Sequence, residues 1–260
     1  MKIIIYFILS IFIFSFTGCA GSPYGNDTLF QISTINALMD GAYRGEMTIG
    51  QLKRYGDFGI GTLDALDGEM IVLEGKFYQI KADGIAYPVP DSMTTPFAVI
   101  TVFDNDKTVP VQTGMDYEGM QHYLDELILD KGIFYAVKIA GTFKYIKTRS
   151  VPRQKEPYPP LIEAVKGQTI FEFHDVKGTI VGFWCPESVK GVNVPGYHFH
   201  FITADRKAGG HLLACQIKDV TIDIDYTTEF YMVLPQQTGM LLQSDPGKDR
   251  GKELKKIEQE

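Results

Sequence analysis

A short histidine-bearing segment constrains the fold of this chain more than any other feature. Three of its five histidines, His198, His200 and His211, lie in the stretch GYHFHFITADRKAGGHLLACQIKD. If residues 197–203 are extended, the two-residue period of a strand places His198 and His200 on one face. The Gly209–Gly210 pair then predicts a tight reversal that returns the chain to His211. The segment is therefore expected to bring three imidazole rings together.

Three such rings predict a metal site, because neutral histidine nitrogen is a common ligand of zinc. Three protein ligands leave a fourth coordination position open, which is typical of catalytic rather than structural zinc. The alternative is that the rings are structural, since a His-x-His pattern alone is weak evidence and spacing does not establish convergence. His122, in an expected helix, and His174, in the strand-like stretch FEFHDV, are interpreted as structural residues.

The amino terminus predicts export. Lys2 precedes an apolar run over residues 3–16, which is too short for a convincing spanning helix and is typical of a secretory signal. The stretch FTGC ending at Cys19 resembles a bacterial lipobox, although Phe16 replaces the usual leucine. Residues 1–19 are therefore interpreted as a lipoprotein-type signal peptide, with Cys19 as a lipid anchor to a membrane. Plain secretion or release into the periplasm is the alternative.

The other cysteines and the charge give weaker information. Cys185 and Cys215 are expected to be buried free thiols, with a disulfide between them as the alternative in an exported protein. Cys215 is not expected to be a metal ligand. The formal charge of -7 argues against a nucleic-acid partner, because such a surface needs clustered Lys and Arg.

Local patterns predict a mixed α/β (α+β) protein. Thr48 and Gln51 form a capping-box pattern at the start of a short helix, and residues 116–131 carry an apolar stripe behind the N-cap Asp116. Hairpins are predicted around Glu74–Gly75 and Ala140–Gly141.

The stretch PRQKEPYPP at residues 152–160 predicts a linker, because it holds four prolines among polar residues. It would separate an N-terminal mixed-sheet α/β domain over residues 20–151 from a β-rich domain over residues 161–260 that carries the histidines. Each domain is expected to contain a β-sheet with short helices, and the metal site is expected near their junction.

Three separated motifs in this order resemble the α-acetolactate decarboxylase family. They are GDFGIGTLDALDGEM at 56–70, KTRSVPRQKEPYPPLIEAVKGQ at 147–168 and GYHFHFITADRKAGGHLL at 196–213. The resemblance extends from about residue 28 to residue 235. It implies a two-domain α/β fold, a homodimer, and Zn²⁺ held by three histidines that match His198, His200 and His211.

The same resemblance implies further site residues. From the first motif come Thr62 and Glu69, and from the second comes Arg149. A glutamate near the carboxyl terminus completes the family's site, and Glu258 is chosen here over Glu253 and Glu260. Without the resemblance, Thr62 and Glu69 would be interpreted as turn residues and Arg149 as an exposed strand charge.

The implied reaction is zinc-dependent decarboxylation of 2-acetolactate to acetoin and CO₂. Zinc acting as a Lewis acid would stabilise the enediolate that forms when CO₂ leaves. Arg149 would bind an anionic group, and Glu69 is the preferred acid–base residue, although the proton donor stays open. Two alternatives remain: an exported zinc-dependent hydrolase, because three histidines and a glutamate also activate water, and a metal-binding lipoprotein without catalytic activity.

Overall fold

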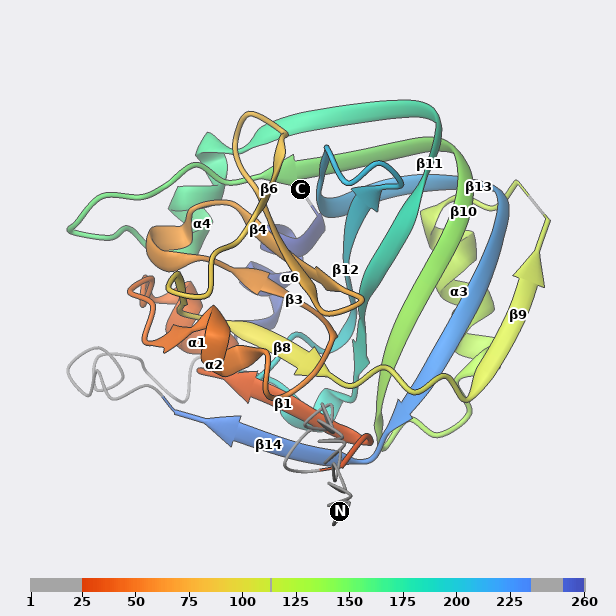
Figure 1. Ribbon diagram of the computed structural model, residues 1–260, viewed down its shortest axis with the longest axis horizontal. Coiled ribbons are helices and arrows are strands. Elements are labelled where there is room, and N and C mark those ends of the chain that lie inside the picture. The colour runs from red at the N-terminus through yellow and green to blue at the C-terminus, as the bar shows by residue number, and fades with distance from the viewer. Residues whose placement is uncertain (1–24, 113, 235–249, 260) are drawn as a thin grey trace, which may run out of the picture.

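The computed structural model describes residues 25–112, 114–234 and 250–259 (Figure 1). No helix within those ranges is both long and apolar enough to cross a bilayer. The predicted signal peptide and Cys19 lie outside the described residues, so export and lipid anchoring stay predictions. The fold is mixed α/β and rich in strands, as the sequence predicted.

A seven-stranded sheet contains most of the N-terminal strands. All its neighbouring strands are antiparallel except β1 and β14, which run parallel. In spatial order the strands are β14 (Glu229–Val233), β1 (Thr28–Ile32), β8 (Ala98–Thr101), β3 (Phe58–Thr62), β4 (Glu69–Leu73), β5 (Lys76–Ile80) and β6 (Ala86–Pro88). A separate two-stranded ribbon pairs β2 (Met47–Thr48) with β7 (Thr94–Thr95).

The second sheet is built from long, curved antiparallel strands (Figure 1). Because β10 pairs with β13 as well as with β11, the strands β10, β11, β12 and β13 close into a ring. The fifth strand, β9, pairs with β13 alone. In order the strands are β10 (Phe134–Ser150), β11 (Thr169–Cys185), β12 (Gly196–Thr203), β13 (Gly209–Thr227) and β9 (Lys107–Val111).

Short helices cover the sheets. They are α1 (Ile35–Met39), α2 (Ile49–Leu52), α3 (Tyr117–Leu127), α4 (Leu161–Ala164) and α6 (Gly251–Gln259), with 3₁₀ turns at Asp64–Leu66, Val165–Gly167 and Glu187–Val189.

The predicted capping box of Thr48 and Gln51 is present at α2. The Asp116 carboxylate accepts the Gly119 amide at 2.9 Å and caps α3 as predicted. The helix ends at Leu127, earlier than the predicted residue 131, because the backbone of Ile128 is extended.

One of the two predicted hairpins is confirmed. Glu74 and Gly75 have φ of 55° and 71° and connect β4 to β5, which is the backbone that a two-residue turn requires. The prediction of a turn at Ala140–Gly141 is wrong, because β10 continues through both residues. A Cβ on Gly141 would lie 2.3 Å from the Asp219 carbonyl oxygen, so this glycine permits the close approach of β13.

Three buried apolar clusters hold the layers together. One lies between the two sheets and includes Ile71 of β4 and Ile202 of β12. A second packs α3 against the ring of the five-stranded sheet. A third covers the other face of the seven-stranded sheet. The faces of β4 and β12 that bury Ile71 and Ile202 also carry Glu69 and His200, so the candidate site is built into the contact between the sheets.

The sheets exchange strands across the proline-rich stretch. β10 precedes residues 152–160 but lies in the five-stranded sheet, and β9 does so as well. β14 follows them by many residues, yet it pairs with β1 in the seven-stranded sheet. The chain therefore passes from one sheet to the other at points outside residues 152–160. The division into domains of 20–151 and 161–260 stays a prediction.

Candidate metal centre and active site

The three histidines of the β12–β13 segment converge. His200 and His211 are directly opposite each other in neighbouring strands, and His198 lies two residues along β12 on the same face. The ring centroids are 5.1 to 5.3 Å apart. One nitrogen from each ring lies within 4.8 Å of the other two. The predicted convergence is confirmed, and no other cluster of this kind occurs among the residues that the structure describes.

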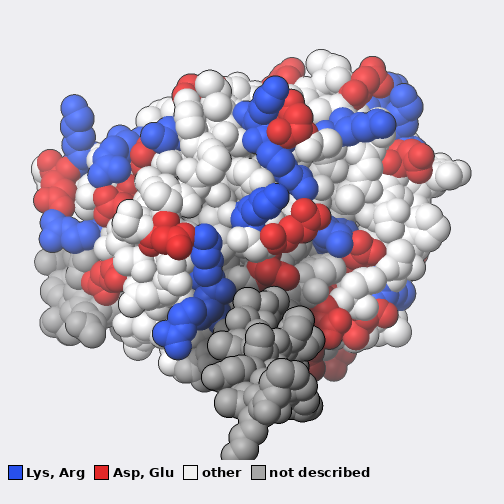
Figure 2. All heavy atoms as spheres, viewed as in Figure 1, with Lys and Arg blue, Asp and Glu red and all other residues white. Residues whose placement is uncertain are grey.

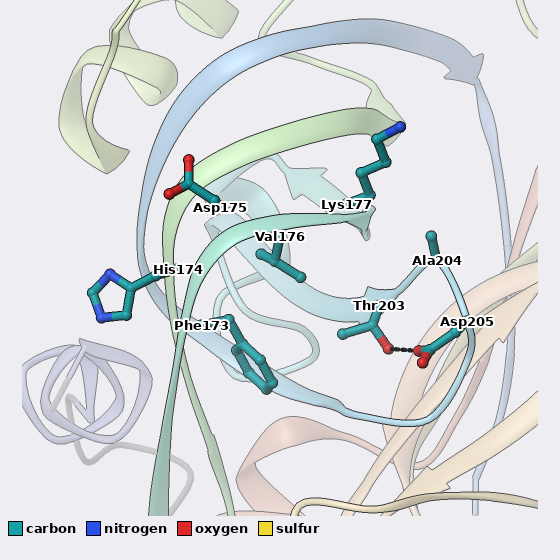
Figure 3. A pocket seen from close by; sticks show the side chains of 8 residues that line it. All are labelled: Phe173, His174, Asp175, Val176, Lys177, Thr203, Ala204 and Asp205. Carbon is teal, nitrogen blue, oxygen red and sulfur yellow. Dashed lines mark hydrogen bonds between the residues drawn. The ribbon is translucent and has the colours of Figure 1, made fainter.

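The reversal between the two strands comes earlier in the chain than the sequence predicts. The chain turns over residues 204–208, and Gly209 and Gly210 already pair with β12. The Thr203 hydroxyl organises this turn. It donates to Asp205 Oδ1 at 2.7 Å (Figure 3), and it accepts the Ala208 amide at 3.1 Å. This side-chain turn replaces the glycine turn that the sequence suggested.

The two glycines instead permit close packing behind the histidines. A Cβ on Gly209 would lie 2.2 Å from the carbonyl oxygen of Phe201. A Cβ on Gly210 would lie 2.5 Å from the carbonyl oxygen of Arg149. Side chains at these positions would push β12 and β10 away from β13, so the glycines bring His211 close to both neighbours.

Hydrogen bonding prepares His200 as a metal ligand. Its Nδ1 lies 2.9 Å from the carbonyl oxygen of Met70, so Nδ1–H donates there and the lone pair is left on Nε2. That Nε2 atom is buried and has no hydrogen-bond partner among the described residues. A buried nitrogen with a free lone pair fits a site that receives a metal ion.

Burial keeps the three rings neutral. It lowers the pKa of His198 to about 3, with a smaller contribution from the Arg149 charge. It also lowers the pKa of His200 and of His211 well below the ordinary value. Neutral imidazole is the form that binds metal. The donor set therefore fits a divalent ion of the zinc type.

Glu69 faces the histidines from β4. Its Oε2 lies 3.6 Å from His200 Nε2, and its Oε1 lies 3.7 Å from Arg149 Nη1. Burial raises the pKa of this carboxyl to about 7; Arg149 opposes the rise, and Glu258 adds to it. The group is therefore placed to exchange a proton near neutral pH. It is a buried site group, and the interpretation as a solvated turn carboxylate is wrong.

Thr62 is the cross-strand neighbour of Glu69. Its side chain is buried, and the hydroxyl donates to the Gly68 carbonyl at 2.7 Å. The loop between the two residues contains three positive φ angles, 62° at Ala65, 54° at Leu66 and 81° at Gly68. At Ala65 and Leu66 such conformations are costly unless the surroundings fix them, whereas Gly68 adopts them freely. In this structure Thr62 therefore stabilises the loop that delivers Glu69.

Arg149 is buried on β10, directly opposite His211 of β13. Its Nη2 donates to the carbonyl oxygen of Ile257 at 3.1 Å, and its Nε has no partner among the described residues. The interpretation as an exposed strand charge is wrong. A buried guanidinium with unused N–H capacity beside three histidines is suited to bind an anion.

Glu258 enters the site from α6. Its Oε2 lies 3.5 Å from His198 Nε2 and 3.8 Å from His211 Nε2. Its backbone oxygen lies 3.1 Å from the same nitrogen of His211. Burial raises the pKa of its carboxyl to about 7, and Arg149 opposes the rise. Of the other two candidates, Glu253 pairs with Arg250 at 3.7 Å, and Glu260 lies outside the described residues.

Two further participants are backbone atoms, the carbonyl oxygens of Met70 and Ile257. They orient His200 and Arg149, but a backbone acceptor leaves no mark in a pattern of side chains. Cys185 and Cys215 are buried free thiols, as expected, and neither belongs to the site. The outer surface says little about the ligand, because acidic and basic side chains are mixed on the face shown in Figure 2.

The chain is similar to known proteins over most of its length. A family model described as alpha-acetolactate decarboxylase matches residues 29–245. The alpha-acetolactate decarboxylase of Methanosarcina mazei is 48% identical over 237 residues, covering 91% of this chain and 82% of that protein. That of Methylococcus capsulatus is 44% identical over 238 residues, covering 91% of both proteins. The crystal structure of the Bacillus subtilis alpha-acetolactate decarboxylase superposes with a TM-score of 0.86 at 37% identity, covering 90% of this chain and all of the other.

Proposed function

The chain belongs to the alpha-acetolactate decarboxylase family, and from that premise we propose that it decarboxylates 2-acetolactate to acetoin and CO₂. The observation that carries the proposal is the convergence of His198, His200 and His211 within 4.8 Å. Two carboxyl groups and one guanidinium face the same three rings.

His198, His200 and His211 would hold the metal, for which we propose Zn²⁺. Three neutral nitrogen donors leave the charge of the ion uncompensated, and the two nearby carboxyl groups have raised pKa values. When bound, zinc supplies a Lewis acid that stabilises negative charge developing on oxygen as CO₂ leaves.

Arg149 binds the anionic part of the substrate in this proposal. Its guanidinium lies between Glu69 and the carbonyl oxygen of Ile257, and its buried Nε is left to donate. Charge-assisted hydrogen bonds from a fork of N–H groups match a carboxylate or a developing oxyanion. Arg149 therefore positions and stabilises the anion in this proposal, and another group supplies the proton.

Glu69 and Glu258 are the groups that hold and move protons. Decarboxylation leaves an electron pair on carbon that must be protonated, and a carboxyl group with a pKa of about 7 is partly protonated at neutral pH. The two glutamates approach the rings from different elements, β4 and α6. Two donors on different elements could deliver the proton from different directions, which would determine the acetoin enantiomer.

The site also excludes water. His200, His211 and Arg149 are at most 4% exposed, and Glu69 is 8% exposed. Removal of water strengthens each electrostatic interaction with the developing charge. The raised carboxyl pKa values are a second effect of the same burial.

The experiment is to measure acetoin formation from racemic 2-acetolactate by the purified full chain, with and without a metal chelator. Acetoin production that stops with the chelator and returns with added Zn²⁺ supports the proposal. Parallel assays with ester and amide substrates test the hydrolase alternative. A zinc-loaded protein that forms no acetoin and hydrolyses neither substrate supports the non-catalytic alternative.

We further propose that the chain is exported with a lipid at Cys19 and forms a homodimer. Both proposals come from the sequence: the lipobox-like stretch carries the first, and family resemblance carries the second. Loss of membrane partition in Cys19→Ser would support lipid attachment. Light scattering of the purified protein measures the oligomeric state.

A further inference from the structure

Arg250 attaches the start of α6 to a distant part of the chain. Its Nη2 lies 2.5 Å from Asp40 Oδ1, and its Nη1 donates to the carbonyl oxygen of Asn36 at 3.3 Å. The two charged side chains are only 13% and 22% exposed. Asp40 is the C-cap of α1, and Asn36 belongs to its first turn. The Asn36 carbonyl also accepts the Asp40 amide at 3.0 Å, so Arg250 adds a second donor to it. A cation is favourable near the C-terminal end of a helix.

The other end of α6 lies in the active site. The Ile257 carbonyl accepts from Arg149, and the Glu258 carbonyl lies 3.1 Å from His211. The Glu258 carboxylate faces His198 and His211. Along a helix, eight residues span about 12 Å. The ion pair of Arg250 with Asp40 is therefore about 12 Å from Glu258 along the helix axis.

The residues that attach α6 share one face of the helix. Leu254 and Ile257 are buried in the cluster between the sheets. With Arg250 and Glu258 they follow the spacing i, i+4, i+7 and i+8, which is one stripe along a helix. Apolar contacts of this kind are non-directional, so they hold the helix down without fixing its rotation or its position along its axis. An ion pair with an added carbonyl contact is directional. It restrains both from the end of α6 opposite to the Ile257 and Glu258 carbonyl contacts.

We propose that Arg250, paired with Asp40, is a positioning residue that sets the place of Glu258 in the active site. A shift of α6 by one residue turns the helix by about 100°, which would carry the Glu258 carboxyl away from His198 and His211. The inference rests on the proposed function, because it assigns to Glu258 a part in the decarboxylation.

The test measures kcat/KM for 2-acetolactate in the zinc-loaded full chain. The variants are Arg250→Ala, Asp40→Asn and their double mutant, each made alone and together with Glu258→Gln. We expect either anchor variant to lower kcat/KM about tenfold, as loss of a supporting contact commonly does. The double mutant should lose no more than one single variant. In the Glu258→Gln background the anchor variants should have no further effect, because there is no carboxylate left to position.

Two controls separate positioning from general damage. Lys255 is exposed on the same helix, so Lys255→Ala removes an equal charge and should keep the wild-type rate. Zinc content, measured by mass spectrometry, should stay unchanged in every anchor variant. If Arg250→Ala does not fold, Arg250→Lys and Asp40→Asn carry the same test, with Arg250→Lys giving the smaller loss.

The outcomes are distinguishable. Equal fractional losses in the wild-type and Glu258→Gln backgrounds would show an effect that bypasses Glu258 and would overturn the inference. Full activity of Arg250→Ala beside an impaired Glu258→Gln would overturn the inference and leave the proposed function intact. Full activity of Glu258→Gln would overturn both the inference and the role given to Glu258.

Discussion

The carboxylate of Glu69 and the guanidinium of Arg149 lie 3.7 Å apart, and both side chains are buried. An opposite charge at this distance normally lowers the pKa of a carboxyl group. Burial outweighs Arg149 here, and the pKa of Glu69 rises to about 7. The pair therefore combines a buried guanidinium with a carboxyl group that changes charge near neutral pH.

Substitution of His200 should remove metal and activity together. We expect His200→Ala to lose zinc retention and acetoin formation, because it removes one of the three converging donors, the imidazole that the Met70 carbonyl orients. Zinc content and acetoin are measured on the same sample. His122→Ala is the control, because His122 is exposed on α3. Full activity in a metal-free His200→Ala variant would disprove the role of the metal.

Arg149→Lys should reduce turnover by about 100-fold while zinc content stays normal. A lysine ammonium keeps the charge but cannot reproduce the planar fork, which contacts Glu69 and the Ile257 carbonyl at once. The matched control is Arg54→Lys, at an exposed position. A wild-type rate in Arg149→Lys would remove Arg149 from the site.

The stability of the metal-free protein should depend on pH through Glu69. Its pKa is raised from 4.5 to about 7, so between these values the folded state binds more protons than the unfolded state. Stability is then lost as pH rises through this window. Relative to the wild type, Glu69→Gln should gain melting temperature between pH 4.5 and pH 7. A constant difference across that range would contradict the raised pKa. The buried histidines make an opposite contribution to the pH dependence of stability. Because the wild type and Glu69→Gln both contain them, this contribution cancels in the comparison.

Asp225 should destabilise the fold at alkaline pH. It is wholly buried, and one of its carboxylate oxygens has no partner among the described residues. Burial raises its pKa to about 7, and Asp106, Asp27 and Asp104 add to the rise. Asp225→Asn should therefore raise the melting temperature at pH 8 by about 2 to 4 °C, which corresponds to about 1 kcal/mol.

At pH 5 the same Asp225→Asn variant should melt like the wild type, because Asp225 is then protonated. Asp219→Asn, at an exposed position of the same strand, should change neither value. A lower melting temperature for Asp225→Asn at pH 8 would show that the charge is stabilised by its surroundings.

Gly209→Ala should disturb the metal site by forcing apart the strands that carry its histidines. The new methyl group would lie 2.2 Å from the Phe201 carbonyl, so β12 and β13 must separate. We expect a loss of about 1–3 kcal/mol in the free energy of unfolding, together with weaker zinc binding. Denaturant titration and competition with a chromogenic chelator measure the two effects. Gly114→Ala is the control, because nothing lies within 4 Å of its Cβ position. Normal zinc affinity in Gly209→Ala would show that the spacing of the strands does not control the site.

The parts of the site that follow local periodicity could be predicted from the sequence. His198 and His200 share a face because a strand repeats every two residues, and Asp116 caps α3 by a local contact. Glu69 and Arg149 were identified only by resemblance to a family. Neither residue has a local pattern that distinguishes a buried site group from a surface charge.

The features that the sequence did not predict depend on contacts between distant segments. Local sequence predicts turns at Gly141, Gly209 and Gly210, but each marks a place where another strand passes too closely for a side chain. Glycine serves both purposes, and local sequence cannot separate them. The acceptors for His200 and Arg149 are backbone atoms of other elements, whose positions follow from the completed fold.

The parallel pairing of β1 with β14 has a consequence for synthesis of the protein. Thr28 is paired with Glu229, and Ile32 with Val233, so this sheet joins segments from near the two ends of the sequence. While the ribosome is still translating, β1 emerges early and keeps one hydrogen-bonding edge unpaired until residue 233 has been made. An open edge of this kind invites pairing with other nascent chains. Premature termination before β14 should therefore yield aggregates rather than a smaller folded protein.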